Sequence, residues 1–272
     1  MITPNTADQT PGGHLAYLDL GIQIHGDLAK GTLSYAVGLF NGVVDAGSAD
    51  TDINDGKDLA FRLFAHPFKN SPDSPLKNLG LGLAGTLGNQ EGALPAYRTP
   101  GQVSFFTYTD TTVADGSRLR LSPQAYYYVG PLGLFGEYAS SKQEVARKTD
   151  TAELQHSAWQ VAVSYVLTGE ASSYRSVTPK NAFDLDKGQW GAFEIAARIH
   201  QLSTDKETYP IFANANRSAR SARAWSVGLN WHLNKNAKFN LDYEQTQFKG
   251  GAASGADRKA EKLLFHRFQV AF

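Results

Sequence analysis

Apolar side chains recur at every second position along nearly the whole chain, in segments too long for most soluble strands. Clear examples lie at 18–24, 159–167 and 225–231. A period of two places successive side chains on opposite faces of a strand. About eleven such strands of roughly 10 to 14 residues follow one another, whereas a globular strand usually has about 5 to 6 residues and a membrane-crossing one about 9 to 11. The pattern predicts an all-β protein of antiparallel strands.

The connections between these strands alternate in length. Tight turns are predicted at 27–31, 69–74, 130–131 and 234–237, and longer polar stretches at about 43–56, 89–116, 146–153, 205–220 and 249–259. Short turns on one side and long loops on the other are typical of transmembrane β-barrels. The stretch 169–187 is long although it falls on the short-turn side. We assign Phe105, Phe106 and Tyr108 to the long loop, because a further crossing there would break the alternation.

Composition and motifs exclude several other classes. Lys and Arg total 26 against 26 Asp and Glu, which argues against the basic footprint of a nucleic-acid-binding domain. No run of about 18 uncharged apolar residues indicates a membrane-spanning helix. The seven His residues are dispersed, and no HExxH, Gly-x-Ser-x-Gly or helix-opening Gly-rich motif is present. The sequence therefore predicts neither an enzyme nor a cofactor or metal site.

The opposite face of each predicted strand is polar, as a barrel that encloses water requires. Examples are Gln23, Arg62, Arg118, Arg120, Ser122, Gln124, Gln160, Ser164, Glu194, Arg198, Asn230, Asn240, Arg267 and Gln269. Aromatic residues near strand ends predict girdles at the membrane interfaces. They are Tyr126, Tyr127, Tyr128, Trp159, Tyr165, Trp190, Trp225 and Trp231.

The end of the chain favours the same fold. Leu264, Phe268, Val270 and Phe272 share one face of the last strand, and a C-terminal Phe after such alternation resembles the closing strand of outer-membrane barrels. The residues before the first strand contain no secretory signal, and the turn pattern gives an odd number of strands where bacterial barrels have an even one. We expect residues 1–272 to be a single barrel domain whose N-terminal strands and signal peptide are missing.

Several segments are similar to the phosphate-selective porins of the O and P type. They lie at 38–42, 67–70, 97–102, 122–128, 159–170, 190–198 and 228–231. The resemblance implies a 16-stranded barrel, of which about eleven strands are present here, in the outer membrane of a Gram-negative cell. It also implies a homotrimer surrounded by outer-membrane lipid, and a water-filled channel for passive uptake of small anions, most of all phosphate or polyphosphate.

In that family, inward-pointing Arg side chains form a ladder for phosphate. Arg98, Arg118 and Arg120 lie beside the family-like segments and are the best match, and Arg62 and Arg267 are a second tier chosen because the alternation turns them inward. A guanidinium binds phosphate oxygens through a planar fork and keeps its proton.

Two features weaken the transfer of the family's selectivity to this chain. The inward carboxylates Asp19, Glu137, Glu194 and Asp242 oppose the positive charge of the ladder, and the net charge is +0. We expect the family's constriction loop in the missing N-terminal portion, with at most its tail in residues 1–16.

Three alternatives remain open from the sequence alone. The chain could be a general porin, or one for another anion, with weak selectivity. It could be a soluble β-sandwich with a binding or structural role, in which the polar faces simply meet solvent. It could also be an inactive fragment, because the open edges of a sheet in lipid leave unpaired backbone groups that cost several kcal/mol each.

Overall fold

The computed structural model describes residues 19–42, 56–174 and 176–271. Eleven strands form one sheet in chain order, each antiparallel to its neighbours. They are β1 (Gly21–Leu28), β2 (Leu33–Phe40), β3 (Asp58–Ala65), β4 (Leu79–Gly92), β7 (Val113–Val129), β8 (Leu132–Arg147), β9 (Asp150–Val166), β10 (Ala192–Ser203), β11 (Ala219–His232), β12 (Ala237–Gly250) and β13 (Glu261–Val270). The prediction of eleven antiparallel strands is confirmed.

Connection lengths follow the predicted alternation in part. The short turns at 29–32, 130–131 and 233–236 lie at one end of the sheet, together with the long connection 167–191 and with the connection 66–78, where a tight turn was predicted at 69–74. The prediction of a long loop at 146–153 is wrong. Strands β8 and β9 extend into this stretch, and Lys148 and Thr149 alone join them. The polar residues there belong to a hairpin that extends beyond the apolar band, where both faces of a strand meet water.

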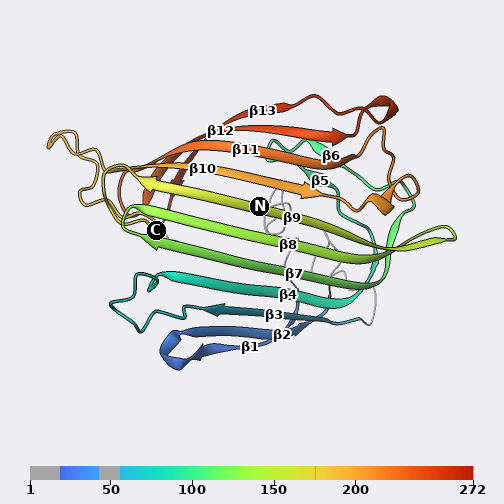
Figure 1. Ribbon diagram of the computed structural model, residues 1–272, viewed down its shortest axis with the longest axis horizontal. Helices are drawn as coiled ribbons and strands as arrows, with labels where there is room; N and C mark the ends of the chain where they lie inside the picture. The colour runs from blue at the N-terminus through green and yellow to red at the C-terminus, as the bar shows by residue number, and fades with distance from the viewer. Residues whose placement is uncertain (1–18, 43–55, 175, 272) are drawn as a thin grey trace.

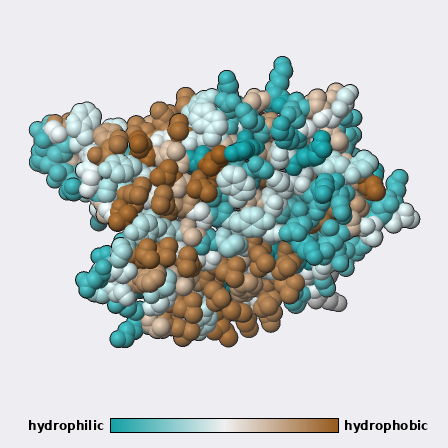
Figure 2. Space-filling model, in the orientation of Figure 1, coloured by the Kyte–Doolittle hydropathy of each residue, from teal (hydrophilic) through white to brown (hydrophobic). Residues whose placement is uncertain are grey.

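The outer face of the sheet is apolar. Exposed side chains at alternate positions include Ile22, Ile24, Leu39, Leu81, Leu87, Val161, Val163, Val227, Leu241 and Leu264. Figure 2 shows that hydrophobic residues cover the outer face over the part of the strands nearer the short turns, while hydrophilic residues cover the opposite end. Contiguous apolar surface of this extent is what a lipid-facing wall requires.

Aromatic residues border this apolar band. Trp159 and Tyr165 are six positions apart on the outer face of β9, and Trp225 and Trp231 are six apart on β11. Six residues of strand span about 20 Å, close to the roughly 25 Å height of the apolar band of such barrels. Tyr126 differs from the prediction, because it faces inward and stacks on Phe64 with ring centroids 5.5 Å apart.

The sheet curves around the connection between β4 and β7 (Figure 1). That connection contains a two-stranded sheet of β5 (Tyr97–Arg98) and β6 (Ser104–Phe106). Phe105 and Phe106 share one buried cluster with side chains from five consecutive strands: Ala139, Ala158, Leu202, Ala222 and Phe248. One segment reaches five neighbouring strands because they bend around it. We call this concave side the inner face and residues 93–112 the inner segment.

The two outermost strands, β1 and β13, have no hydrogen-bonded neighbour on their outer edges within the part of the chain that the structure describes. Because ten antiparallel pairings separate them, they run in the same direction. Within the same residues, no helix is long and apolar enough to cross a bilayer.

Candidate functional site

Small residues make a floor on the inner face of β4. The strand reads Leu-Gly-Leu-Gly-Leu-Ala-Gly-Thr-Leu-Gly, and the leucines point outward while Gly80, Gly82, Ala84, Thr86 and Gly88 point inward. Side chains from the neighbouring strands lie over this floor. A Cβ added at Gly82 would lie 2.6 Å from Cγ of Gln124 and 2.8 Å from a ring carbon of Phe64. The glycines therefore admit large side chains from β3 and β7.

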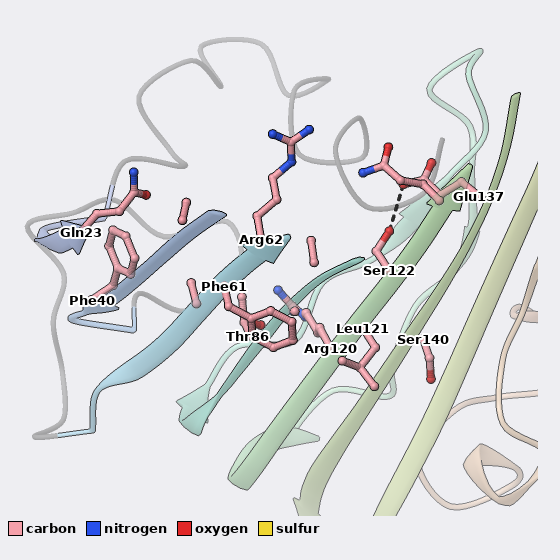
Figure 3. Close-up of a pocket in the computed structure, with 15 residues that line it drawn as sticks. Gln23, Phe40, Phe61, Arg62, Thr86, Arg120, Leu121, Ser122, Glu137 and Ser140 are labelled. Carbon is pink, nitrogen blue, oxygen red and sulfur yellow. Dashed lines mark hydrogen bonds between the residues drawn. The ribbon is translucent and has the colours of Figure 1, made fainter. Parts of the chain in front are cut away.

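A cavity of about 460 Å³ lies over this floor (Figure 3). Its polar lining comes from five strands. The inward polar side chains are Gln23 from β1, Arg62 from β3, Thr86 from β4, Arg120, Ser122 and Gln124 from β7, and Glu137 from β8. Alternation brings these residues together, since register partners across a sheet share a face.

Arg62 extends from β3 over the cavity (Figure 3). Its side chain is exposed, and its guanidinium lies 5.1 Å from the ring centroid of Phe64. Among the described residues, no carboxylate forms an ion pair with Arg62. An aromatic face orients the guanidinium without neutralising its charge. Arg62 therefore presents a fixed positive charge to the enclosed space.

Arg120 lines the same cavity from β7. It pairs in register with Thr86 of β4 and Ser141 of β8, and its Nε donates to Ser141 Oγ at 3.4 Å. Arg62 and Arg120 come from strands separated only by the small residues of β4. The structure thus brings two of the five predicted ladder residues into one cavity.

Arg118 occupies a buried ion pair instead of the cavity wall. Its Nη2 donates to Asp58 Oδ2 at 2.6 Å, and its side chain is 6% exposed. Gln90 Nε2 donates to the other oxygen of Asp58 at 3.2 Å. The pair crosses β4 at Gly88, where an added Cβ would lie 2.8 Å from Cγ of Asp58. We therefore expect Arg118 to support the wall more than to contact solutes.

The two remaining predicted residues lie elsewhere. Arg98 is exposed on β5 of the inner segment, and Arg267 is exposed on β13, opposite Asn240. Neither Arg98 nor Arg267 lines the cavity that the described residues form. Residues 1–16, which could hold the tail of a constriction loop, lie outside the described residues.

The inner segment narrows the enclosed space and is held by aromatic contacts. Phe106 is fully buried, and its ring lies 5.3 Å from that of Tyr97 and 5.0 Å from that of Tyr108. Tyr108 Oη lies 2.7 Å from His156 Nε2 of β9, and Ser218 Oγ donates to Thr107 O at 2.7 Å. We predicted this stretch as part of the long loop 89–116. Consecutive aromatic residues within a loop were the signal that it packs against the wall.

Replacing Phe106 with Leu is expected to loosen the inner segment while the sheet stays folded. The loss of ring contacts should cost about 1 to 2 kcal/mol and raise tryptic cleavage after Arg98 about tenfold through local opening. Cleavage after the exposed Lys187 in the connection 167–191 serves as the control. An equal rise at both sites would show general destabilisation and contradict a specific role of Phe106.

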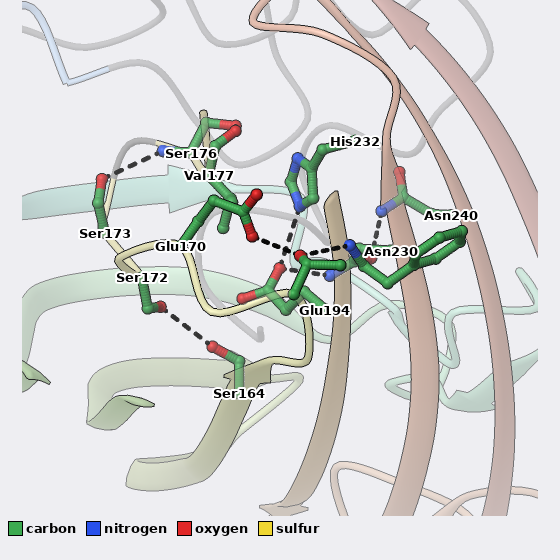
Figure 4. Close-up of polar contacts among 12 residues, drawn as sticks. Ser164, Glu170, Ser172, Ser173, Ser176, Val177, Glu194, Asn230, His232 and Asn240 are labelled. Atoms are coloured by element: carbon green, nitrogen blue, oxygen red, sulfur yellow. Dashed lines mark hydrogen bonds and ion pairs between the residues drawn. The ribbon is translucent and has the colours of Figure 1, made fainter. Parts of the chain in front are cut away.

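The wall formed by β10, β11 and β12 carries a different charge pattern. Glu244 Oε2 accepts from Arg198 Nη2 at 2.9 Å and lies 3.3 Å from His200 Nε2. Glu194 Oε2 accepts from Asn230 Nδ2 at 2.9 Å and lies 3.3 Å from His232 Nε2 (Figure 4). Both carboxylates thus have hydrogen-bond partners on neighbouring strands. On the opposite part of the sheet, Arg62 has no carboxylate partner within the described part of the chain.

The connection 167–191 also contacts the inner face, at the short-turn end (Figure 4). Ser172 N donates to Gly130 O at 2.8 Å, and the Tyr174 ring stacks on Tyr126 at 4.9 Å. Burial raises the pKa of Glu170, but hydrogen bonds from Thr168 and from the N–H of Lys180 outweigh it and hold that pKa below its ordinary value. A negative charge therefore stays fixed at this end.

A lipid-facing outer band, aromatic borders, a polar inner face and an inward-folded segment together define a wall of an outer-membrane porin. The family model of the phosphate-selective porins O and P matches residues 15–272. The chain belongs to this family, whose members are channels and not enzymes. It is accordingly a protein of the outer membrane.

A solved structure shows the same fold. The outer-membrane expressed OmpT of Vibrio cholerae matches with a TM-score of 0.50 at 12% sequence identity, over 89% of this chain. The chain spans 60% of the length of that OmpT structure. A search of curated protein sequences found no match.

Proposed function

We propose that this porin conducts small anions by passive diffusion and that phosphate or polyphosphate is the preferred solute. The observation that carries the proposal is the convergence of Arg62 and Arg120 on one cavity of the inner face. Guanidinium groups remain charged at every physiological pH and bind phosphate oxygens through parallel N–H bonds. The family description supports the same solute class.

The same inner face favours modest selectivity. Glu137 lines the cavity together with the two Arg residues, and Glu194, Asp242 and Glu244 lie along the inner face of β10 and β12. These carboxylates reduce the positive potential that concentrates anions in a narrow passage. A general porin with weak anion preference is therefore the second candidate, and it is distinguished by how strongly phosphate competes with chloride.

The sign of the ion selectivity tests the proposal. The purified protein is added to a planar bilayer, and the reversal potential is measured across a potassium chloride gradient. We expect a potential of the sign that chloride permeation gives, with a smaller value at high ionic strength because salt screens the wall charges. A cation-selective potential would contradict an anion pathway along Arg62 and Arg120.

We further propose that additional strands complete the barrel. Direct pairing of β1 with β13 would be parallel, since both run in the same direction, whereas barrels of this kind are antiparallel throughout. An odd number of intervening strands removes the conflict. The homotrimer that the family resemblance implies stays a prediction.

Cysteine cross-linking tests the additional strands, and the chain contains no native Cys. We expect no disulfide between Gln23→Cys in β1 and Cys at Leu263, Phe265 or Arg267 in β13, because a disulfide needs Cα atoms within about 7 Å. Tyr243→Cys with Leu264→Cys, which are register partners in β12 and β13, is the positive control. Efficient β1–β13 cross-linking would show that the sheet closes on itself.

A further inference from the structure

The cavity on the inner face holds a negative group opposite its positive ones. Glu137 Oε1 accepts from Ser122 Oγ at 3.0 Å, and Oε2 accepts from Gln160 Nε2 at 2.7 Å. Among the described residues, no Lys, Arg or His forms an ion pair with this carboxylate. Each oxygen keeps acceptor capacity after one hydrogen bond. The carboxylate is therefore held in position and can accept from a solute.

A free dianion is a poor match for such a cavity. Phosphate at Arg62 gains from the guanidinium but stands in the field of the Glu137 carboxylate, and like charges in a partly desolvated site oppose binding. A solute that carries an anionic group and an ammonium group on one molecule can pair with Arg62 and with Glu137 at the same time. Its ammonium also fills the remaining acceptor positions of Glu137.

The dimensions favour a small organic solute over a single ion. The cavity of about 460 Å³ falls within the range of pockets that bind small organic molecules. Arg62 and Glu137 stand on β3 and β8, which three strand spacings separate, or about 14 Å between backbones. Both side chains extend from the inner face (Figure 3). The inward surface between them includes Ala84, Ser122 and Gln124. Ala84 offers apolar contact to a short carbon chain, and the other two offer polar contacts.

We propose that this cavity binds zwitterionic organic phosphates or phosphonates, in which a short carbon chain joins the phosphoryl group to an ammonium group. The phosphoryl group lies toward Arg62 and Arg120, and the ammonium group lies at Glu137. The proposal rests on the proposed anion pathway and names its solute class more narrowly. Ser122 and Gln160 act as positioning residues, because they hold the carboxylate toward the cavity.

Competition binding in detergent tests the solute class. Radiolabelled inorganic phosphate is equilibrated by dialysis with the purified protein, and phosphoethanolamine, ethyl phosphate and ethanolamine are compared as competitors. Phosphoethanolamine and ethyl phosphate differ only in the ammonium group. We expect phosphoethanolamine to compete about fivefold better than ethyl phosphate, the effect of one partly screened charge pair, and ethanolamine to compete hardly at all.

Glu137→Gln provides the decisive variant, because the amide keeps the shape of the side chain and removes its charge. We expect the preference for phosphoethanolamine over ethyl phosphate to disappear and the binding of inorganic phosphate to tighten. Glu153→Gln, at an exposed site paired with Lys142 outside the cavity, is the matched control and should change neither.

The outcomes separate the two proposals. Phosphate binding that ethyl phosphate and phosphoethanolamine displace equally would overturn the zwitterionic solute class and leave the anion pathway standing. Weaker binding of all three phosphates in Glu137→Gln would assign Glu137 a structural role and overturn the proposal as well. Absence of phosphate binding in the folded wild-type protein would overturn both.

Discussion

Replacing Arg62 and Arg120 together with Ala is expected to weaken the block of chloride current by phosphate about 100-fold or more. Each charge-assisted hydrogen bond contributes about 1.5 to 3 kcal/mol, and each 1.4 kcal/mol corresponds to about tenfold in affinity. Arg62 is exposed over the cavity and Arg120 lines it, so the cost to folding should be small beside the cost to binding. Single-channel recording with increasing phosphate measures the change.

Arg223→Ala is the matched control for this pair of substitutions. Arg223 is exposed on β11, at a position whose alternation places it on the outer face. Its removal lowers the net charge in the same direction without changing the inner face. An equal loss of phosphate block in Arg223→Ala would show that overall charge, and not the cavity, determines the affinity.

Replacing Arg118 with Ala is expected to lower the free energy of unfolding by about 3 to 5 kcal/mol, because it leaves a buried charge without its partner. Asp58 is 6% exposed and would keep Gln90 as its side-chain donor among the described residues. The pair joins β3 to β7 across β4. Urea unfolding in lipid or detergent, followed by tryptophan fluorescence, measures the loss.

A double variant distinguishes the buried charge from general damage. Asp58→Asn combined with Arg118→Gln removes both charges and is expected to recover most of the stability lost in Arg118→Ala, because neither buried partner is then ionised. A double variant as unstable as Arg118→Ala would contradict the explanation based on the orphaned carboxylate. It would then point to packing of the Arg118 side chain against β4.

The sequence predicted the strands well because lipid and water impose opposite demands on the two faces of each strand. Ile22, Val161 and Val227 are exposed on the outer face while inward neighbours are polar, as the period of two requires. The period does not report where a strand leaves the membrane. This is why the polar hairpin of β8 and β9 was predicted as a loop, although Lys148 and Thr149 alone join the strands.

The inner segment could not be predicted from periodicity, because a loop that folds inward has no repeating pattern. Phe105 and Phe106 are buried against residues contributed by strands more than 100 positions away, such as Phe248. Tyr126 was predicted in an interfacial girdle, but it has the inward alternation of Ser122 and Gln124 and packs against Phe64 and Tyr174. Long-range packing determines the position of the inner segment.

Alternation identified which Arg residues face inward but not which of them face a solute. Arg62, in the second tier of the sequence prediction, stands exposed over the cavity, while Arg118, in the first tier, is buried against Asp58. The difference depends on Gly88 and on the position of Asp58, which lies 60 residues away in the chain. The glycine alternation in β4 is the sequence signal that could have indicated the cavity.

The most direct test of the anion pathway is the chloride current of single channels while phosphate is added at constant ionic strength. An anion channel in which phosphate binds at Arg62 and Arg120 gives a chloride current that falls with saturation as phosphate increases. A current that changes only in proportion to the chloride replaced would contradict a phosphate site and leave a general porin.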